Sequence, residues 1–297
     1  MINSILSKNA GFYSQFFFLV NHYLHAKKNN LNFKVHSDDW LFKYKNGWED
    51  YFKYIDINTG IVTDHQHFSH FNVIEDFKLS EYKTAIQQIY NYNDCITEKI
   101  LITKNQLTLK SNYDAIFIRR GDKLCEESNF VCTEKYIEIL LNKNPDCHTI
   151  FVQTDDYNCY LDVKNYVNDH NLSIDVVTLC DENNKGGMII ISDYKRRIEL
   201  ALNEHSTNKY YISTVIDNLR SKIPIDQLND EELYKHTTDM LIGIQIVLES
   251  NIVVCDYSSN VSRFIKLAHK NSDNVFELNN PDNDINWNRT ICPAFCF

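Results

Sequence analysis

The second half of the chain alternates short apolar runs with longer amphipathic segments. Runs rich in β-branched and aromatic residues predict strands over 113–118, 149–154, 174–179, 251–256 and 274–278, and helices are expected over 134–143, 157–169, about 231–249 and 260–270. Strands that alternate with helices form a parallel sheet, because each strand returns to the same edge through a crossover helix. The sequence therefore predicts an α/β fold with a doubly wound sheet.

The first half has a less regular pattern. Apolar positions at helical spacing predict a helix over 11–29, a strand follows at 31–35, and residues 79–109 are largely helical. The stretch from 38 to 77 is aromatic and polar without a clear period. We place a lobe boundary near residues 110–112, which gives an N-terminal α/β lobe over 1–111 and a C-terminal Rossmann-like lobe over 112–297.

The charge balance limits the partners of the chain. With 40 Asp and Glu against 30 Lys and Arg, the formal net charge is −10, and no basic run exceeds Lys195-Arg196-Arg197. Long-range electrostatics therefore disfavour nucleic acid and anionic membranes as partners. A phosphorylated ligand would need a local basic pocket.

Cysteine use and hydropathy give further expectations. Nine cysteines without a Cys-x-x-Cys pair argue against a zinc ribbon and against a complete disulfide framework. The longest apolar run near the start, Phe16 to Val20, is far too short for a membrane span, and we expect no signal peptide or transmembrane anchor. The compartment stays unknown, with the cytoplasm as one option.

A dense group of charged residues follows the strand expected at 113–118. It comprises Arg119, Arg120, Asp122, Lys123, Glu126 and Glu127. Side chains at the carboxyl end of a parallel strand face the crevice where open α/β sheets bind ligands. Adjacent guanidinium groups suit a multiply charged anion such as phosphate, because each offers a planar fork of donors and stays charged. The alternative is a solvated loop with internal ion pairs.

These residues are similar to a motif of a known family. The α1,6-fucosyltransferases that modify the N-glycan core, and the related nodulation-factor fucosyltransferases, share the pattern His-x-Arg-Arg-x-Asp-Lys with a glutamate four residues beyond the lysine. This chain resembles the pattern at Arg119, Arg120, Asp122, Lys123 and Glu127, with Phe117 in place of the histidine.

Further segments match the family in the same order along the chain. Residues 254–263 are similar to Val-Cys-x-x-Ser-Ser-Gln-Val-x-Arg, with Asn260 for the glutamine, and Thr154-Asp155-Asp156 ends the strand expected at 149–154. Near the amino terminus, Gly11 to Gln15 resembles Gly-Tyr-Gly-x-Gln, and residues 40–49 carry a Trp...Gly-Trp-Glu segment. Together these motifs cover most of the chain.

The resemblance implies a GT-B-like fold of two Rossmann-like lobes, with the donor site in the cleft and the C-terminal lobe binding the donor. It also implies a metal-independent inverting glycosyltransferase that needs no cofactor. Such an enzyme transfers fucose from the donor substrate GDP-fucose to a sugar hydroxyl of a glycan acceptor. The alternatives are an enzyme that uses another GDP-sugar and a pseudoenzyme that binds a nucleotide or glycan.

The resemblance also assigns roles within the first motif. Arg119 would stabilise the charge that grows on the β-phosphate, and Arg120 would make a second donor contact or a structural one. Glu127 would act as general base toward the acceptor hydroxyl, with Lys123 orienting or polarising it. Asp122 would hold the arginines in place. An exposed loop acid is the alternative for Glu127.

Two polar groups at later strand ends have open interpretations. Ser258, Ser259 and Asn260 precede the helix expected at 260–270, where backbone N–H groups and hydroxyls can bind phosphate, but on sequence alone they could equally cap that helix. The resemblance favours contact with the donor. By resemblance, Asp155 and Asp156 would face the donor sugar or ribose, and helix capping is again the alternative.

We expect no metal site. The Asp155-Asp156 pair could chelate a cation, but it lacks the spaced Asp-x-Asp of metal-dependent transferases. A His-x-His-x-x-His spacing could ligate zinc, yet a polar loop without a nearby cysteine favours a structural or acceptor-side segment; its members are His65, His67 and His70.

The remaining donor contacts match the family less well. Gly11 belongs to the amino-terminal turn, and Phe42, or alternatively Tyr44, lies near the family's base-stacking tyrosine. The family has a donor-contacting aspartate where this chain has Gly243, and Asp239, one helical turn earlier, would substitute for it.

Overall fold

The computed structural model describes residues 1–8, 10–57, 66–68, 77–109, 112–122, 130–190 and 222–278. These residues form two compact units, each considered by itself. The first contains the described residues of Met1–Lys99 and Asn229–Thr238, and the second those of Ile100–Leu228 and Asp239–Ile285. None of the helices in the described ranges combines the length and the apolar character that a membrane span requires.

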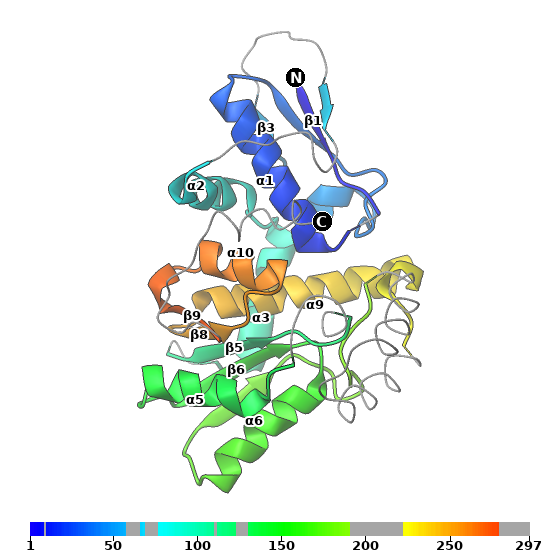
Figure 1. Cartoon of the computed structure of the whole chain (residues 1–297). Helices are drawn as coiled ribbons and strands as arrows, with labels where there is room; N and C mark the ends of the chain where they lie inside the picture. Colours follow the sequence, from blue (N-terminus) through cyan, green and yellow to red (C-terminus); the bar gives the residue numbers. More distant parts are fainter. Residues whose placement is uncertain are drawn as a thin grey trace, which may run out of the picture. The chain divides into compact units, whose positions relative to one another are not determined.

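The first unit is built on a small sheet with the order β3-β2-β1-β4 (Figure 1). Strand β1 pairs in parallel with β2 and β4, and β2 pairs antiparallel with β3. The strands are β1 (Ile2–Ile5), β2 (Phe33–His36), β3 (Asp56–Ile57) and β4 (Gln66–Phe68). The helical elements are α1 (Phe12–Lys28), η1 (Gly47–Asp50) and α2 (Leu79–Ile89), followed by the start of α3 (Asp94–Gln106).

Aromatic side chains form the core of this unit. The ring of Trp48 stacks on Phe52 with centroids 4.3 Å apart and also lies parallel to the ring of Phe16 on α1. The carboxylate of Asp50 accepts hydrogen bonds from four successive backbone N–H groups of residues 44–47, which fixes the turn before η1. Ring packing and this turn therefore order a stretch that has no helical or strand period.

The second unit contains a parallel sheet with the order β7-β6-β5-β8-β9. Its strands are β5 (Asp114–Ile118), β6 (Thr149–Thr154), β7 (Asp175–Thr178), β8 (Val253–Cys255) and β9 (Val275–Glu277). Its helical elements are α5 (Thr133–Lys143), α6 (Tyr157–Asp169), η2 (Ile225–Gln227), most of α9 (Asp230–Glu249), α10 (Asn260–Ala268) and η3 (Ser272–Asn274).

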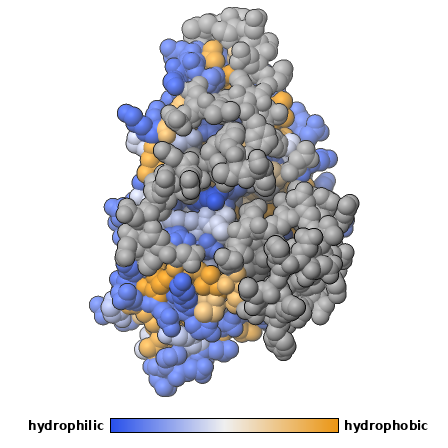
Figure 2. Space-filling model, viewed as in Figure 1, coloured by the Kyte–Doolittle hydropathy of each residue, from blue (hydrophilic) through white to orange (hydrophobic). Residues whose placement is uncertain are grey.

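The strand register separates the two faces of this sheet. Phe117 of β5 is paired with Gln153 of β6 and with Cys255 of β8, so these three side chains share one face. The opposite face packs against α5 and α6 in one apolar core; its strand residues include Ile116, Ile118, Val152 and Val254. The outward surface around α6 is mainly hydrophilic (Figure 2), as expected for a helix that buries only one side.

The order of the strands reverses at β5. The chain continues from β5 to β6 and β7 on one side, and later returns to β8 and β9 on the other side. Open α/β sheets bind ligands at the carboxyl edge beside such a reversal, because the two loops there leave in opposite directions. In this sheet those loops follow β5 and β8.

The α/β fold class and most elements expected from the sequence are confirmed. Strand 149–154 and helix 157–169 match β6 and α6 at both ends. Strands β1, β3 and β4 were not predicted. In β1 the residues Asn3 and Ser4 are polar but buried, and they are satisfied by contacts to His36 and His22 at 3.0 and 2.8 Å. Hydrogen bonding thus replaces the apolar pattern that would have marked this strand.

The two compact units divide within α3, between Lys99 and Ile100. The boundary expected from the sequence lies later, at residues 111–112. Residues Asn229–Thr238 at the start of α9 group with the first unit, which a single cut along the sequence does not anticipate.

Candidate functional site

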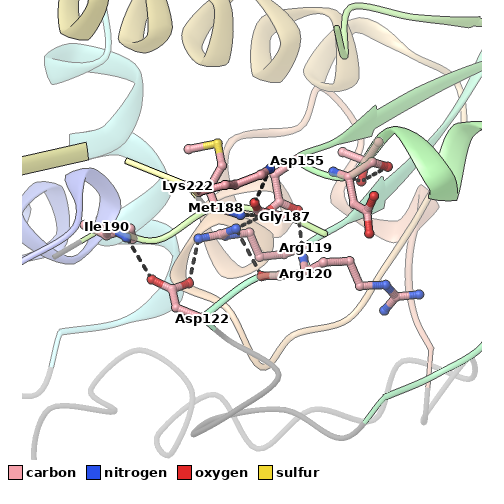
Figure 3. A network of polar contacts seen from close by, with 10 residues as sticks. Arg119, Arg120, Asp122, Asp155, Gly187, Met188, Ile190 and Lys222 are labelled. Atoms are coloured by element: carbon pink, nitrogen blue, oxygen red, sulfur yellow. Dashed lines mark hydrogen bonds and ion pairs between the residues drawn. The ribbon is translucent and has the colours of Figure 1, made fainter. Parts of the chain in front are cut away.

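The carboxyl ends of β5 and β6 bring together the first and third sequence motifs. Arg119, Arg120 and Asp122 follow β5, and Asp155 and Asp156 follow β6, the neighbouring strand. Parallel pairing places both strand ends at the same edge of the sheet. The structure therefore gathers these five predicted site residues in one region of the second unit, and Figure 3 labels four of them, Arg119, Arg120, Asp122 and Asp155.

Arg119 lies between two carboxylates. Its Nη2 donates to Asp122 Oδ1 at 2.7 Å, and its Nη1 forms an ion pair with Asp155 and donates to the carbonyl oxygen of Arg120 at 3.1 Å. The Arg119 side chain is 13% exposed, so this arrangement is largely shielded from water but still reaches the surface. The contact with Asp122 restricts the orientation of the Arg119 guanidinium group.

Both carboxylates also hold the segment 187–190. Asp155 accepts hydrogen bonds from the backbone N–H groups of Arg120 at 2.7 Å and Met188 at 3.0 Å. Asp122 Oδ2 accepts from the N–H of Ile190 at 3.0 Å, and the Asp122 N–H donates to the Met188 carbonyl. Three separate stretches of chain thus meet around the guanidinium group of Arg119.

Two glycines permit this close approach. Gly121 has φ +68° and Gly187 has φ +84°, which is the left-handed region that L side chains rarely adopt. A Cβ on Gly121 would overlap the backbone of Met188, and one on Gly187 would overlap the backbone of Gly121. The loop after β5 and the segment 187–190 can therefore pack backbone to backbone.

Lys222 also belongs to this region, although no sequence motif predicted it. Its Nζ donates to the carbonyl oxygen of Gly187 at 2.6 Å. Burial lowers the pKa of Lys222, and the negative charge of Asp156 opposes that effect. Lys222 lies outside every motif, and no spacing relates an isolated lysine to a group one hundred residues earlier, so only the fold reveals it.

The two adjacent arginines differ in their surroundings. The side chain of Arg120 is buried, donates from Nη2 to the carbonyl oxygen of Val131 at 2.7 Å and lies over the ring of Phe130. Figure 3 shows it running away from the group around Arg119. Of the two roles expected for Arg120, these contacts correspond to the structural one.

Asp156 and Ser259 both act as helix caps. Asp156 is buried and accepts from the Asn158 N–H at 3.1 Å at the start of α6, and Ser259 accepts from the Ser262 N–H at 3.1 Å at the start of α10. Ser258 is bonded through its N–H to Asp256, at 2.9 Å. The capping alternative is thus realised for Asp156 and Ser259, while Asp155 binds Arg119 instead.

Asn260, Asp239 and Gly243 differ in their surroundings. Asn260 Oδ1 accepts from Arg263 Nη1 at 3.0 Å. Asp239 is exposed on α9. Gly243 lies four residues further along α9, and the carboxamide of Gln153 occupies the position of its missing Cβ.

The predicted residues of the first unit surround the end of β1. Gly11 is the N-cap residue of α1, and Gln15 braces the preceding loop through bonds to the backbone of Ser7 and Ala10. Phe42 is 3% exposed and packs edge-on against Phe12, so its ring belongs to the aromatic core. That burial argues against Phe42 as a stacking surface for a base.

Some predicted residues fall outside the described ranges. These are Lys123, Glu126 and Glu127, together with the side chains of His65, His67 and His70. Among the residues whose side chains are described, no group of three His, Cys, Asp or Glu could hold a metal ion.

The site offers directed hydrogen-bond donors rather than excess positive charge. The region contains three basic side chains, of Arg119, Arg120 and Lys222, and three carboxylates, of Asp122, Asp155 and Asp156. Arg119 uses three of its five N–H donors in contacts with the described residues. An anion would therefore be recognised by a preoriented guanidinium group.

Comparison with known proteins supports the fold. Neither a protein-family model nor a curated protein matches the chain. The chain is similar to the crystal structure of NodZ α-1,6-fucosyltransferase soaked with GDP-fucose, with a TM-score of 0.56 at 10% identity, covering 94% of this chain and 96% of that chain. Fucosyltransferase NodZ from Bradyrhizobium gives a TM-score of 0.54 at 10% identity, covering 94% and 95%. NodZ co-crystallized with GDP gives 0.54 at 10% identity, covering 90% and 92%. The expected GT-B-like fold is confirmed.

Proposed function

We propose that this protein is a metal-independent inverting glycosyltransferase that transfers fucose from GDP-fucose to a sugar hydroxyl of a glycan or oligosaccharide. The observation that carries the proposal is the position of Arg119 at the end of β5, held by Asp122 and Asp155 beside the reversal of strand order. The likeness of the fold to NodZ structures soaked with GDP-fucose and co-crystallized with GDP supports it.

The chemistry assigned to these residues is stabilisation of a leaving phosphate. As the glycosidic bond breaks, negative charge grows on the nucleoside diphosphate, and the guanidinium group of Arg119 would bind the oxygen that carries it. Asp122 and Asp155 keep the guanidinium group in one orientation, which reduces reorganisation during the reaction. Glu127 would remove the proton from the attacking hydroxyl, with Lys123 positioning it.

Two features favour another GDP-sugar, or binding without turnover, as the second candidate. Phe117 is buried at the place of the family's histidine, and Gln153 fills the space beside Gly243. Both changes concern recognition of the donor rather than the leaving phosphate. They therefore bear on donor identity before they bear on the reaction.

Titration calorimetry with GDP, UDP and CMP, followed by transfer assays with GDP-fucose and other GDP-sugars, tests the proposal. Selective binding of GDP together with fucose transfer to a glycan is the expected result. Selective GDP binding without transfer from any GDP-sugar would favour a binding protein. A lack of affinity for all three nucleotides would refute the proposed donor class.

A further inference from the structure

Gln153 is a polar residue in an otherwise apolar row of the second sheet. The neighbouring side chains on the same face are Phe117 and Cys255 in the same register, and Phe151 two residues earlier on β6. All three neighbours are at most 5% exposed. Gln153 is itself only partly exposed and lies just before the carboxyl end of its strand.

The carboxamide of Gln153 has no hydrogen-bond partner among the described residues. Its Oε1 is buried and unpaired. The amide group lies beside Gly243 of α9, where a Cβ would overlap Oε1. The absence of a side chain at position 243 is thus what allows the amide to occupy this place.

An unpaired buried amide is unfavourable for folding. Leaving a buried polar group unsatisfied costs about 1–3 kcal/mol, and an apolar side chain of the same shape avoids that cost. The protein's own packing therefore does not explain a glutamine at this position. A ligand that supplies the missing hydrogen bond does explain it.

The position of Gln153 indicates which part of a ligand it meets. Asp155, the partner of Arg119, lies two residues further along β6, or about 7 Å at the usual rise per strand residue. A phosphate bound by Arg119 would thus leave the next part of the ligand near Gln153. The apolar ring of Phe117 beside the amide suits a flat, aromatic group better than a polyhydroxylated sugar.

We propose that the carboxamide of Gln153 binds the hydrogen-bonding edge of the nucleobase of the donor, over the apolar row that contains Phe117. This inference rests on the proposed function, since it takes the ligand to be a nucleoside diphosphate sugar. A carboxamide offers one acceptor and two donors. It can therefore pair with a base edge that carries a donor beside an acceptor, as the N1–H and O6 of guanine do.

Comparing GDP with inorganic pyrophosphate separates a base contact from a phosphate contact. Gln153→Met keeps the length of the side chain and removes its hydrogen-bonding groups. We expect it to weaken GDP binding about three- to tenfold, the loss of one or two net hydrogen bonds, and to leave pyrophosphate affinity unchanged. Titration calorimetry on the full chain measures both. The melting temperature should not fall, because an unsatisfied amide is removed.

Gln245→Met is the matched control. Gln245 lies on the same helix as Gly243, and its amide bonds to Glu249 at 2.8 Å, so this variant should bind both ligands as the wild type does. Equal weakening of GDP and pyrophosphate by Gln153→Met, or no change in GDP affinity, would overturn the base contact while leaving the proposed function standing. If the wild-type protein binds pyrophosphate but not GDP, both proposals fail.

Discussion

Asp155 forms an ion pair with Arg119 through one carboxylate oxygen, and its other oxygen accepts a hydrogen bond from the backbone N–H of Arg120. One side chain at the end of β6 therefore fixes both the guanidinium group and the main chain at the end of β5. The ion pair is nearly enclosed, with the Asp155 side chain 9% exposed. Removing either partner would leave a charge that water cannot fully solvate.

Arg119→Ala should weaken GDP binding by about 2–3 kcal/mol, because a charge-assisted pair to phosphate is lost. The same variant should melt at a lower temperature, since Asp122 and Asp155 lose their shared cation. Arg119→Lys keeps the charge but lacks the planar fork of donors, so its GDP affinity and melting temperature should lie between those of the wild type and Arg119→Ala. Calorimetry combined with thermal melting tests this, and unchanged GDP affinity in a folded Arg119→Ala protein would remove Arg119 from the donor site.

Gly121→Ala should damage the site without touching a charged residue. The new Cβ would meet the backbone of Met188, and φ +68° is itself unfavourable for alanine. We expect a loss of stability of at least about 1 kcal/mol in denaturant unfolding and weaker GDP binding, since the loop that carries Arg119 must move. Wild-type stability in this variant would show that the two backbones are not tightly packed.

Donor hydrolysis or transfer should survive treatment with EDTA. Asp155 already binds Arg119 and two backbone N–H groups, and Asp156 caps α6, so both carboxylates have structural partners. The measurement is activity after chelation, with and without added manganese. Activity that disappears with EDTA and returns with manganese would mean that the pair holds a metal during the reaction.

Glu127→Gln should abolish turnover and spare GDP affinity, because an amide has the shape of the carboxylate but cannot accept the proton. Loss of a positioned general base typically costs about 10²–10⁴-fold in rate. Glu126→Gln is the neighbouring control and should be mild. Transfer rates and GDP affinity of both variants decide the matter; an inactive Glu126→Gln, or two active variants, would move the role to another carboxylate.

His269 should make the stability of the second unit depend on pH. Burial lowers the pKa of His269 from 6.5, although its contacts to the Asn271 and Ser250 carbonyl oxygens oppose this; Lys270 and Lys266 lower it further. As the pH falls from 6.5 toward the folded-state pKa, the unfolded chain takes up the proton first and stability is lost. We expect the difference in free energy of unfolding between the wild type and His269→Gln, measured by denaturant unfolding, to be smaller at pH 5 than at pH 7.5. A constant difference would contradict the shift.

The elements that could be predicted from the sequence are those whose own residues carry a clear apolar period. Strand β6 and helix α6 each carry their own apolar period, so their ends were correct to the residue. Only the charged side chains of the network around Arg119 could be predicted. The segment 187–190 contributes backbone groups, which every residue type carries, so its sequence does not indicate this role. Phe42 was proposed by its position along the chain, and only the structure shows that its ring packs against Phe12 in the aromatic core.

Helix α9 leaves one compact unit and enters the other without a break, and its first turns complete the aromatic core of the earlier unit. Tyr234 stacks on Tyr44 with ring centroids 4.5 Å apart, although the two residues are 190 positions apart in the sequence. A gene fragment that ends before this helix would encode a first unit that lacks one of its rings. Because α9 contributes residues to both units, a single cut in the gene cannot produce either unit intact.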